Sequence, residues 1–374
     1  MAKRRVAVLG ATGSIGTSAL DVLSRAPDDF EVVLLSSHTQ KDKLEQLHKQ
    51  WPRAALALSG GELLSAIAGA GADITINGIS GAAGLEPSMA AIEAGSSLAL
   101  ANKETVVMAG PLVLQRAREK RVSVIPVDSE HSAVFHLIAA HGAAMSGGAH
   151  GADSLEEIIL TASGGPFRNR TLEEMENVTL EDALAHPTWN MGPKITVDSA
   201  SLANKGLEVI EAVRLFSVPA RQVRVVIHPQ SIVHSMIRMK DGSIYASLSR
   251  PNMRQPIQQA LYWPHTAGSG FDPLDFGALT MEFHAPDTEK FPMLSLAYEA
   301  VMRDGFYPCV YNSANEAAVS AFLSQRIRFL DIPRAVRHIL DRDWSGAPAD
   351  IESVLETHRR AGEAAEVYIK RIKN

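Results

Sequence analysis

Short apolar runs alternate with helical patterns along the first 128 residues. The runs are rich in Val, Ile, Leu and Ala and have no polar face, which is typical of buried strands in a parallel sheet. They predict strands at residues 4–9, 31–36, 54–58, 73–77, 97–100 and 122–127. Helical periodicity between them predicts helices at residues 14–25, 41–50, 61–70, 87–94 and 104–119. This alternation indicates an α/β fold with a doubly wound, Rossmann-type parallel sheet.

The pattern changes after residue 128 to that of an α+β region. Helices are predicted at 132–140, 179–184 and 201–216, and strands at 157–161, 221–227, 231–239 and 243–248. Asp241-Gly242 joins the last two strands as a hairpin. Residues 141–153 are rich in Gly, Ala and Ser and predict a surface loop, and residues 265–273 predict a linker.

The end of the chain is predicted to be helical, at residues 293–303, 313–324, 332–340 and 350–372. Four helices of this length favour a small C-terminal bundle. Three domains are therefore expected: a cofactor domain at 1–128, a central catalytic domain at 129–280 and a helical domain at 281–374. A length of 374 residues is compatible with two or three domains.

Composition narrows the class of protein. Lys and Arg number 36 against 42 Asp and Glu, so the net charge of −6 disfavours nucleic acid as a partner. Cys309 is the one cysteine, which excludes an intrachain disulfide and a cysteine-based metal site. Apolar runs are too short for a signal peptide or a membrane span, so we expect a cytoplasmic protein with no membrane partner.

A glycine-rich turn follows the first predicted strand. Gly10, Gly13 and Gly16 have the spacing G-x-x-G-x-x-G where a strand passes into a helix. Such glycines let the backbone approach a pyrophosphate at the helix N-terminus. The motif predicts a dinucleotide site, and the alternative is a tight turn without a ligand.

The end of the second strand selects between NAD and NADP, because an acid there repels a 2′-phosphate. Residues 36–41 read Ser-Ser-His-Thr-Gln-Lys, without an acid before Asp42. This favours NADPH, and the alternative is a polar turn that binds nothing.

Carboxylates cluster after the last strand of this region. Asp128 and Glu130 are expected to point to one side of an extended chain at the carboxyl end of the strand, where α/β sheets bind ligands. Two adjacent carboxylates favour a cation between them, and oxygen ligands suit Mg²⁺ or Mn²⁺. The alternative is that both acids cap the following helix.

A second polar cluster lies at residues 198–208. Asn204, Lys205 and Glu208 share one edge of a predicted helix. Together with Ser199, the amide and ammonium groups suit a phosphate, and Glu208 could complete the metal site. The alternative is a solvated helix face.

Two loops carry further candidates. Residues 186–193 place Trp189 and Met191 in a loop bracketed by Pro and Gly, which is either a lid or a core anchor. Residues 161–167 form a Gly-rich turn that presents Ser163 to an anion or is a plain turn. His228 and His234 are expected to be structural rather than ligands on residue type alone.

Several segments in the same order resemble the 1-deoxy-D-xylulose 5-phosphate reductoisomerase family. They are GATGSIG, ALANKET, PVDSEHSAVF, TASGGPF, HPTWNMGPKITVDSASLANKGLEVIEA, HPQSIVHSM and NSANEAAV. The resemblance implies NADPH, a divalent ion (Mg²⁺, Mn²⁺ or Co²⁺), a phosphorylated ketose substrate and a homodimer.

The resemblance also implies roles for individual residues. Cofactor contacts are implied for Thr12, Gly13, Ser14, Ile15, Asn102, Glu104 and Gly192. Metal ligation is implied for Asp128, Glu130 and Glu208, which are catalytic together with Lys103. Substrate contacts are implied for Lys103, Ser129, Glu130, Ser163, His186, Trp189, Met191, Ser199, Asn204, Lys205, Glu208 and His228. The flap is residues 186–193.

One segment departs from the family pattern. Members often carry Gly-Arg/Lys-Asn after the second strand, where this chain has His38-Thr39-Gln40. The residues that contact the 2′-phosphate are therefore not assigned by the resemblance.

The implied reaction is rearrangement of 1-deoxy-D-xylulose 5-phosphate and reduction to 2-C-methyl-D-erythritol 4-phosphate, by a retro-aldol route or an α-ketol shift. Another metal-assisted NADP-dependent dehydrogenase and a non-enzymatic nucleotide sensor are the alternatives.

Overall fold

The computed structural model describes residues 2–141, 154–189, 191–268 and 270–372. It contains two compact units, each made of several chain segments. The first consists of residues 1–106, 111–135 and 252–272, and the second of residues 107–110, 136–251 and 273–374. The expected division into three domains follows the sequence order and stays a prediction. Most of the expected loop at 141–153 lies outside the described residues.

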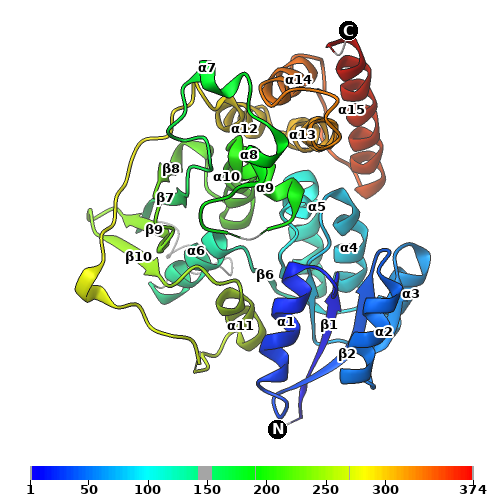
Figure 1. Ribbon diagram of the computed structural model, residues 1–374. Helices are drawn as coiled ribbons and strands as arrows, with labels where there is room; N and C mark the ends of the chain where they lie inside the picture. The colour runs from blue at the N-terminus through cyan, green and yellow to red at the C-terminus, as the bar shows by residue number, and fades with distance from the viewer. Residues whose placement is uncertain (1, 142–153, 190, 269, 373–374) are drawn as a thin grey trace. The chain divides into compact units, whose positions relative to one another are not determined.

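The first unit is built on a parallel sheet of six strands (Figure 1). Its order is β3-β2-β1-β4-β5-β6, and every neighbouring pair is parallel. The strands are β1 Arg4–Leu9, β2 Phe30–Ser37, β3 Ala55–Leu58, β4 Ile74–Asn77, β5 Ser97–Leu100 and β6 Val124–Pro126. Reversal of the strand order beside β1 creates the crevice in which this fold binds nucleotides. The predicted Rossmann-type sheet is confirmed.

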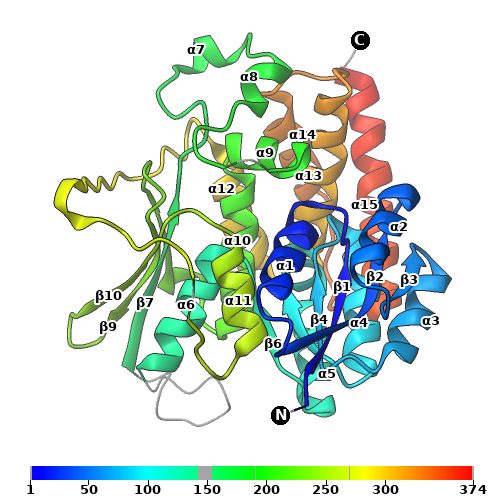
Figure 2. The ribbon, with the colours of Figure 1, turned by 60° about the horizontal axis from the view of Figure 1, so that its bottom comes forward.

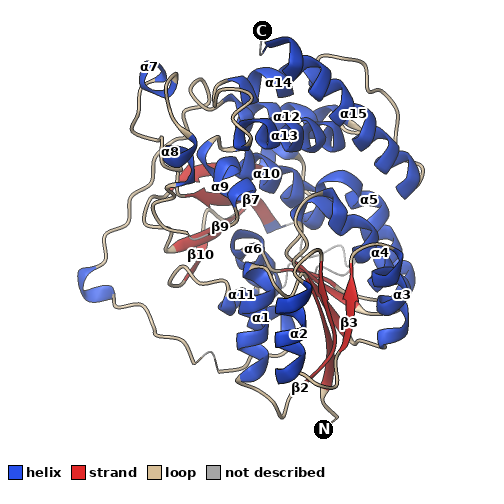
Figure 3. Ribbon diagram, turned by 45° about the vertical axis from the view of Figure 1, so that its right-hand side comes forward, coloured by secondary structure: helices blue, strands red, loops and turns tan. Residues whose placement is uncertain are grey.

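Helices cover both faces of this sheet, with α1 and α2 on one side and α3 and α4 on the other (Figure 3). Their bounds are α1 Ser14–Ser24, α2 Lys41–Gln50, α3 Gly61–Ala70, η1 Ala82–Gly84, α4 Leu85–Glu93, α5 Lys103–Lys120 and α6 Ser129–Ala140. Helix α5 is kinked at Ala109, where the backbone is non-helical just before Pro111. The predicted helices are confirmed, with ends shifted by up to three residues.

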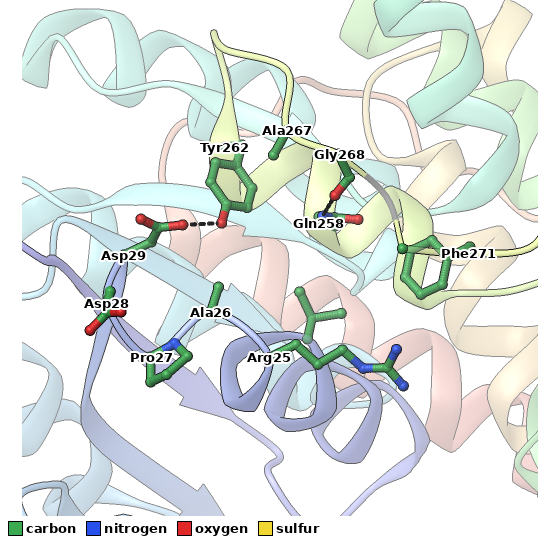
Figure 4. Close-up of a pocket in the computed structure, with 12 residues that line it drawn as sticks. Arg25, Ala26, Pro27, Asp28, Asp29, Gln258, Tyr262, Ala267, Gly268 and Phe271 are labelled. Carbon is green, nitrogen blue, oxygen red and sulfur yellow. Dashed lines mark hydrogen bonds between the residues drawn. The ribbon is translucent and has the colours of Figure 1, made fainter.

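Helix α11, Arg254–Tyr262, also belongs to the first unit and was not expected from the sequence. It packs on α1, where Arg254 forms an ion pair with Asp21 at 2.6 Å. A pocket of about 570 Å³ lies between the C-terminal end of α1 and the residues around α11 (Figure 4). The Tyr262 hydroxyl closes one side of it with a hydrogen bond to Asp29. At 1.5 Å per residue, this pocket is about 16 Å along α1 from the glycine-rich turn, so it is not the dinucleotide site.

The second unit has a mixed sheet of four strands in the order β10-β9-β7-β8 (Figure 2). Its strands are β7 Leu155–Ala162, β8 Val223–Ile227, β9 Val233–Met239 and β10 Ile244–Leu248. Strands β7 and β8 are parallel, and the other pairs are antiparallel. The predicted hairpin at Asp241-Gly242 is confirmed, with Gly242 at φ +89°. Glu157 joins neighbouring strands through ion pairs with Arg224 and Arg238 at 2.8 and 3.0 Å.

The remaining helices of the second unit include one at residues 307–323 that is mostly buried and packs against several of the others. They are α7 Leu172–Met175, α8 Leu180–Leu184, α9 Pro193–Ala200, α10 Ala203–Phe216, η3 Ala220–Gln222, η4 Phe276–Ala278, α12 Pro292–Arg303, α13 Tyr307–Leu323, α14 Asp331–Leu340 and α15 Ile351–Ile372. Helices α12 to α15 form the predicted C-terminal bundle. Thr179 and Asp182 form a capping box at the start of α8.

None of the described helices is both long enough and apolar enough to cross a membrane.

Candidate active site

The glycine-rich turn lies between β1 and α1, as the sequence predicts. Gly10 has φ +73°, and a Cβ there would be 2.9 Å from the carbonyl oxygen of Gly78. A Cβ on Gly16 would be 2.3 Å from the carbonyl oxygen of Gly10, so only glycine allows this close turn. Gly13 is the N-cap of α1 without a side-chain cap, and the first turn of the helix has no acid. The N–H groups of that turn are therefore suited to an anion.

Hydroxyl groups and one lysine fix the base of this turn. The Thr12 hydroxyl is 2.8 Å from that of Ser37 at the end of β2, and Lys43 donates to the Thr12 carbonyl at 2.6 Å. His38 follows β2 directly and lies 2.7 Å from the Ser59 hydroxyl through Nδ1. The exposed surface after β2 thus carries an imidazole and a hydroxyl but no carboxylate at 36–41, which suits a phosphate on the adenosine ribose.

Asp128 and Glu130 lie at the carboxyl end of the same sheet. Lys103 at the start of α5 forms an ion pair with Asp128 at 2.5 Å, with 6% and 16% of the two side chains exposed. The Ser129 hydroxyl donates to Glu130 at 2.6 Å. The expectation that both acids lie on one side of an extended chain is wrong, because α6 begins at Ser129 and places Glu130 in its first turn. An acid in that position also favours the helix through its dipole.

Asn102 has a clear structural task beside this pair. Its side chain caps α5 by accepting from the Thr105 N–H at 2.9 Å. Its amide donates to the carbonyls of Ile79 and Gly81 at 2.7 and 2.8 Å and to Glu104 at 3.1 Å. These bonds occupy the amide, so the Asn102 side chain positions residues 79–81 next to the glycine-rich turn. Helix α5 was expected to begin at residue 104, although Asn at this position is a familiar N-cap signal.

In the second unit, the shared edge of α10 is confirmed. Glu208 accepts from the Asn204 amide at 2.7 Å and from the Lys205 ammonium. The Glu208 carboxylate is fully buried and Lys205 is 3% exposed. A buried carboxylate persists in this form because the lysine and the amide compensate its charge. The edge is therefore not the solvated face that was its alternative.

His186 joins two serines of the same unit. Its Nδ1 accepts from the backbone N–H groups of Thr188 and Trp189 at 3.1 and 2.9 Å, so the proton of the neutral ring is on Nε2. Nε2 is 3.1 Å from both the Ser163 and the Ser199 hydroxyl. Burial lowers the pKa of His186, which agrees with a neutral ring. Three predicted substrate contacts are thus brought together by β7, α9 and the loop before α9.

The predicted flap is a loop that ends at the first turn of α9. Gly192 is the N-cap of that helix and Pro193 its first residue, which is a typical place for proline. Trp189 and Met191 are half-buried, and Gly192 is exposed. Asn190 lies outside the described residues. Helix α9 was not predicted, because residues 186–193 have the composition of a loop and apolar residues recur only weakly at helical spacing in the turn that follows.

His228 has a structural environment. Its ring is fully buried and stacks on Phe283, with centroids 4.7 Å apart. Nδ1 donates to the carbonyl of Glu282 at 2.9 Å, and Nε2 accepts from the N–H of Ile232 at 3.2 Å. Both ring nitrogens therefore bind backbone, and the structure gives no support to a substrate contact by this imidazole. His234, expected to be structural, bonds Ser249 at 2.8 Å.

Comparison with known proteins gives consistent matches over the chain. Models of 1-deoxy-D-xylulose 5-phosphate reductoisomerase match residues 6–59 and 54–110, and models of its C-terminal domains match residues 124–216 and 248–364. Curated enzymes of that name from Treponema denticola and Chlorobium chlorochromatii are each 44% identical, over 96% and 98% of this chain and 96% and 100% of theirs.

Solved structures agree with these sequence matches. The Zymomonas mobilis reductoisomerase in complex with NADPH has a TM-score of 0.89 and 39% identity, covering 98% of this chain and 99% of its own. A reductoisomerase in complex with NADPH, fosmidomycin and magnesium has a TM-score of 0.93 and 35% identity, covering 99% of each chain.

Proposed function

Because this chain belongs to the 1-deoxy-D-xylulose 5-phosphate reductoisomerase family, we propose that it converts 1-deoxy-D-xylulose 5-phosphate to 2-C-methyl-D-erythritol 4-phosphate with NADPH and a divalent metal ion. The carbon skeleton is first rearranged to a branched aldehyde of the same composition. Hydride from NADPH and a proton then reduce the aldehyde to the alcohol. The observation that carries the proposal is the pairing of the family's carboxylates with lysines in both units: Asp128 with Lys103, and Glu208 with Lys205.

The first unit holds the NADPH. The exposed first turn of α1 at Gly13 and Ser14 binds the pyrophosphate, and Thr12 and Ile15 shape the turn. Asn102 and Glu104 contribute by fixing the loop at residues 79–81. Gly192 in the flap is a further proposed contact of the cofactor. A 2′-phosphate is tolerated because the end of β2 has no acid.

Asp128, Glu130 and Glu208 are the proposed ligands of the metal ion. Their chemistry fits Mg²⁺ or Mn²⁺, since all three donors are carboxylates and hard divalent ions prefer oxygen. The fit is supported by the ion pairs of Asp128 with Lys103 and of Glu208 with Lys205, which show that both carboxylates are placed to accept positive charge. When bound, the ion supplies Lewis-acid polarisation of the substrate's carbonyl and hydroxyl oxygens.

The lysines and serines act on the substrate itself. Lys103 is positioned beside Asp128 to stabilise or protonate an oxyanion of the substrate. Ser129, which follows Asp128 in the chain, is the first residue of α6. Ser163, His186 and Ser199 hold the phosphate end, with Asn204 and Lys205 as further donors. Binding energy at the phosphate, away from the reacting carbons, keeps the substrate aligned during rearrangement.

Trp189 and Met191 form the lid of the proposed site. Both are half-buried in a loop whose backbone N–H groups bind His186, so movement of the lid is coupled to the phosphate contacts. Closure would exclude water from the reactive intermediate.

The experiment is Asp128→Asn, with Asp28→Asn on an exposed loop as the matched control. NADPH binding, followed by nicotinamide fluorescence, should be unchanged in both variants because the pyrophosphate turn is intact. Turnover of the ketose phosphate should fall by at least about 100-fold in Asp128→Asn alone, the scale of losing one preorganised electrostatic group. Near-normal turnover of Asp128→Asn with saturating Mg²⁺ would refute the metal assignment.

We further propose a homodimer and a cytoplasmic location. The dimer is supported by the family resemblance, and light scattering of the purified chain tests it: a mass near 80 kDa, twice the 40.2 kDa chain, is expected. Cell fractionation tests the location.

A further inference from the structure

Helix α9 carries Ser199, yet its own sequence gives it little stability. It has eight residues, a glycine N-cap without a side-chain hydrogen bond, and the β-branched residues Ile195, Thr196 and Val197 in succession. Isolated helices of this length are marginal even with better helix formers. The position of α9 must therefore come from contacts with the rest of its unit.

Two charges on α9 oppose its dipole. Lys194 lies in its first turn and Asp198 in its last, each at the unfavourable end, and they pair at 2.8 Å with the lysine on the N-terminal side. That order is the weaker one for a helical ion pair. These residues are therefore not explained by the intrinsic stability of the helix.

The Asp198 carboxylate instead reaches α13. It is 1% exposed, and its second oxygen accepts from the amide of the fully buried Asn315 at 2.7 Å. Asn315 belongs to the family-like segment at residues 312–319, to which the proposed reaction gives no task. The side-chain amide oxygen of Asn315, Oδ1, is buried and has no hydrogen-bond partner among the described residues.

Stability alone does not account for this buried set. A buried amide oxygen without a hydrogen-bond partner destabilises the folded state. Replacing a buried polar pair with apolar side chains of similar volume is often neutral or stabilising. The bond between α9 and α13 is therefore better explained by the geometry that it sets than by a gain in stability.

A close backbone contact of α9 shows how tightly that geometry is set. Gly165, at φ +68°, lies against the backbone of α9, and a Cβ there would be 2.9 Å from the Ser199 carbonyl oxygen. The C-terminal turn of α9 therefore contacts both this glycine and Asn315. The Ser199 hydroxyl, 3.1 Å from Nε2 of His186, sits in that turn.

We propose that Asp198, held by Asn315, is a positioning residue that sets the place of α9 and hence the Ser163–His186–Ser199 arrangement for the substrate's phosphate. This inference rests on the proposed function, because the three residues are assigned to the phosphate there. Asp198 and Asn315 themselves do not touch the substrate. Their effect is on where Ser199 lies.

The test compares three variants by kinetics, unfolding and hydrogen exchange. Asp198→Leu/Asn315→Leu removes both polar groups, and Asp198→Asn retains an amide that can bond to both Lys194 and a rotated Asn315. Ser313→Ala in the same helix is the matched control, because it removes a buried hydrogen bond to the carbonyl of His358 and leaves α9 alone.

For the double variant we expect a free energy of unfolding no lower than that of the unsubstituted protein. The kcat/KM for the ketose phosphate should fall about 100-fold, mostly through KM, as for a displacement of about 1 Å, with the Kd for NADPH unchanged. Amides of α9 should exchange faster. Asp198→Asn should restore most of kcat/KM, and Ser313→Ala should change stability only.

Normal KM and normal α9 exchange in the double variant would overturn the inference. If the double variant does not fold, Asn315→Ala gives the same two readouts, with the same outcomes for and against. Absence of any ketose phosphate turnover in the unsubstituted protein would refute the proposed function, while the exchange of α9 amides would still test its anchoring.

Discussion

Glu208→Gln is the substitution whose energetic effect follows most directly from the structure. Glu208 is fully buried on α10, and its pairing lysine, Lys205, is 3% exposed. Neutralising the acid leaves a buried ammonium without this counter-charge. Breaking a buried ion pair on one side costs about 3–5 kcal/mol, so unfolding of the second unit should require clearly less urea.

A double variant separates this stability effect from catalysis. In Lys205→Met/Glu208→Gln the buried cation is gone, and the free energy of unfolding should return to within about 1 kcal/mol of the unsubstituted value. Turnover should stay at least about 100-fold reduced, since a proposed metal ligand and a phosphate donor are both missing. Asn204 can still donate to the side-chain carbonyl oxygen of the introduced glutamine, so the helix edge keeps one bond.

Urea unfolding followed by circular dichroism, together with NADPH oxidation, measures both quantities. A double variant as unstable as Glu208→Gln would refute the charge argument. An unchanged free energy of unfolding in Glu208→Gln would also refute the charge argument. A fully active double variant would show that Lys205 and Glu208 on α10 are not part of the active site.

Three further outcomes are expected. Trp189→Ala should raise KM for the ketose phosphate with little change in melting temperature, and a large drop in melting temperature would instead identify Trp189 as a core anchor. Burial lowers the pKa of His186 below its ordinary 6.5, so the stability that the neutral ring contributes is present above pH 6.5 and is lost as the pH falls from there through the folded-state pKa. His186→Gln should flatten that part of the plot of stability against pH. An unchanged plot would contradict the assignment of a buried, neutral ring to His186. His38→Asp should raise KM for NADPH much more than KM for NADH, because a carboxylate after β2 repels the 2′-phosphate; equal effects on both would exclude His38 from that contact.

The parallel sheet was predictable because both of its faces are buried. Each strand consists mostly of apolar residues without a polar face, and the helices between the strands differ in period, so the order of elements could be derived from the sequence alone. The glycine-rich turn was also visible, since Gly10 and Gly16 are required by close backbone contacts. The helix edge at Asn204 and Glu208 followed from their four-residue spacing.

Other parts of the site depend on helix ends and on distant contacts. Glu130 was placed in an extended segment because Asp-Ser-Glu does not distinguish a strand end from a first helical turn. Helix α9 was missed because most of its stability comes from outside it. The hydrogen bond between Asp198 and Asn315 joins residues 117 positions apart, and the local pattern of apolar residues cannot predict such a contact.

Oxidation of NADPH by the purified protein with 1-deoxy-D-xylulose 5-phosphate tests the central claim most directly. The measurement is made after treatment with a chelator and again as Mg²⁺ is added back. We predict no oxidation after chelation, and recovery with Mg²⁺ in which one 2-C-methyl-D-erythritol 4-phosphate forms for each NADPH consumed. Oxidation that is indifferent to the chelator, or none under saturating Mg²⁺, would contradict the account.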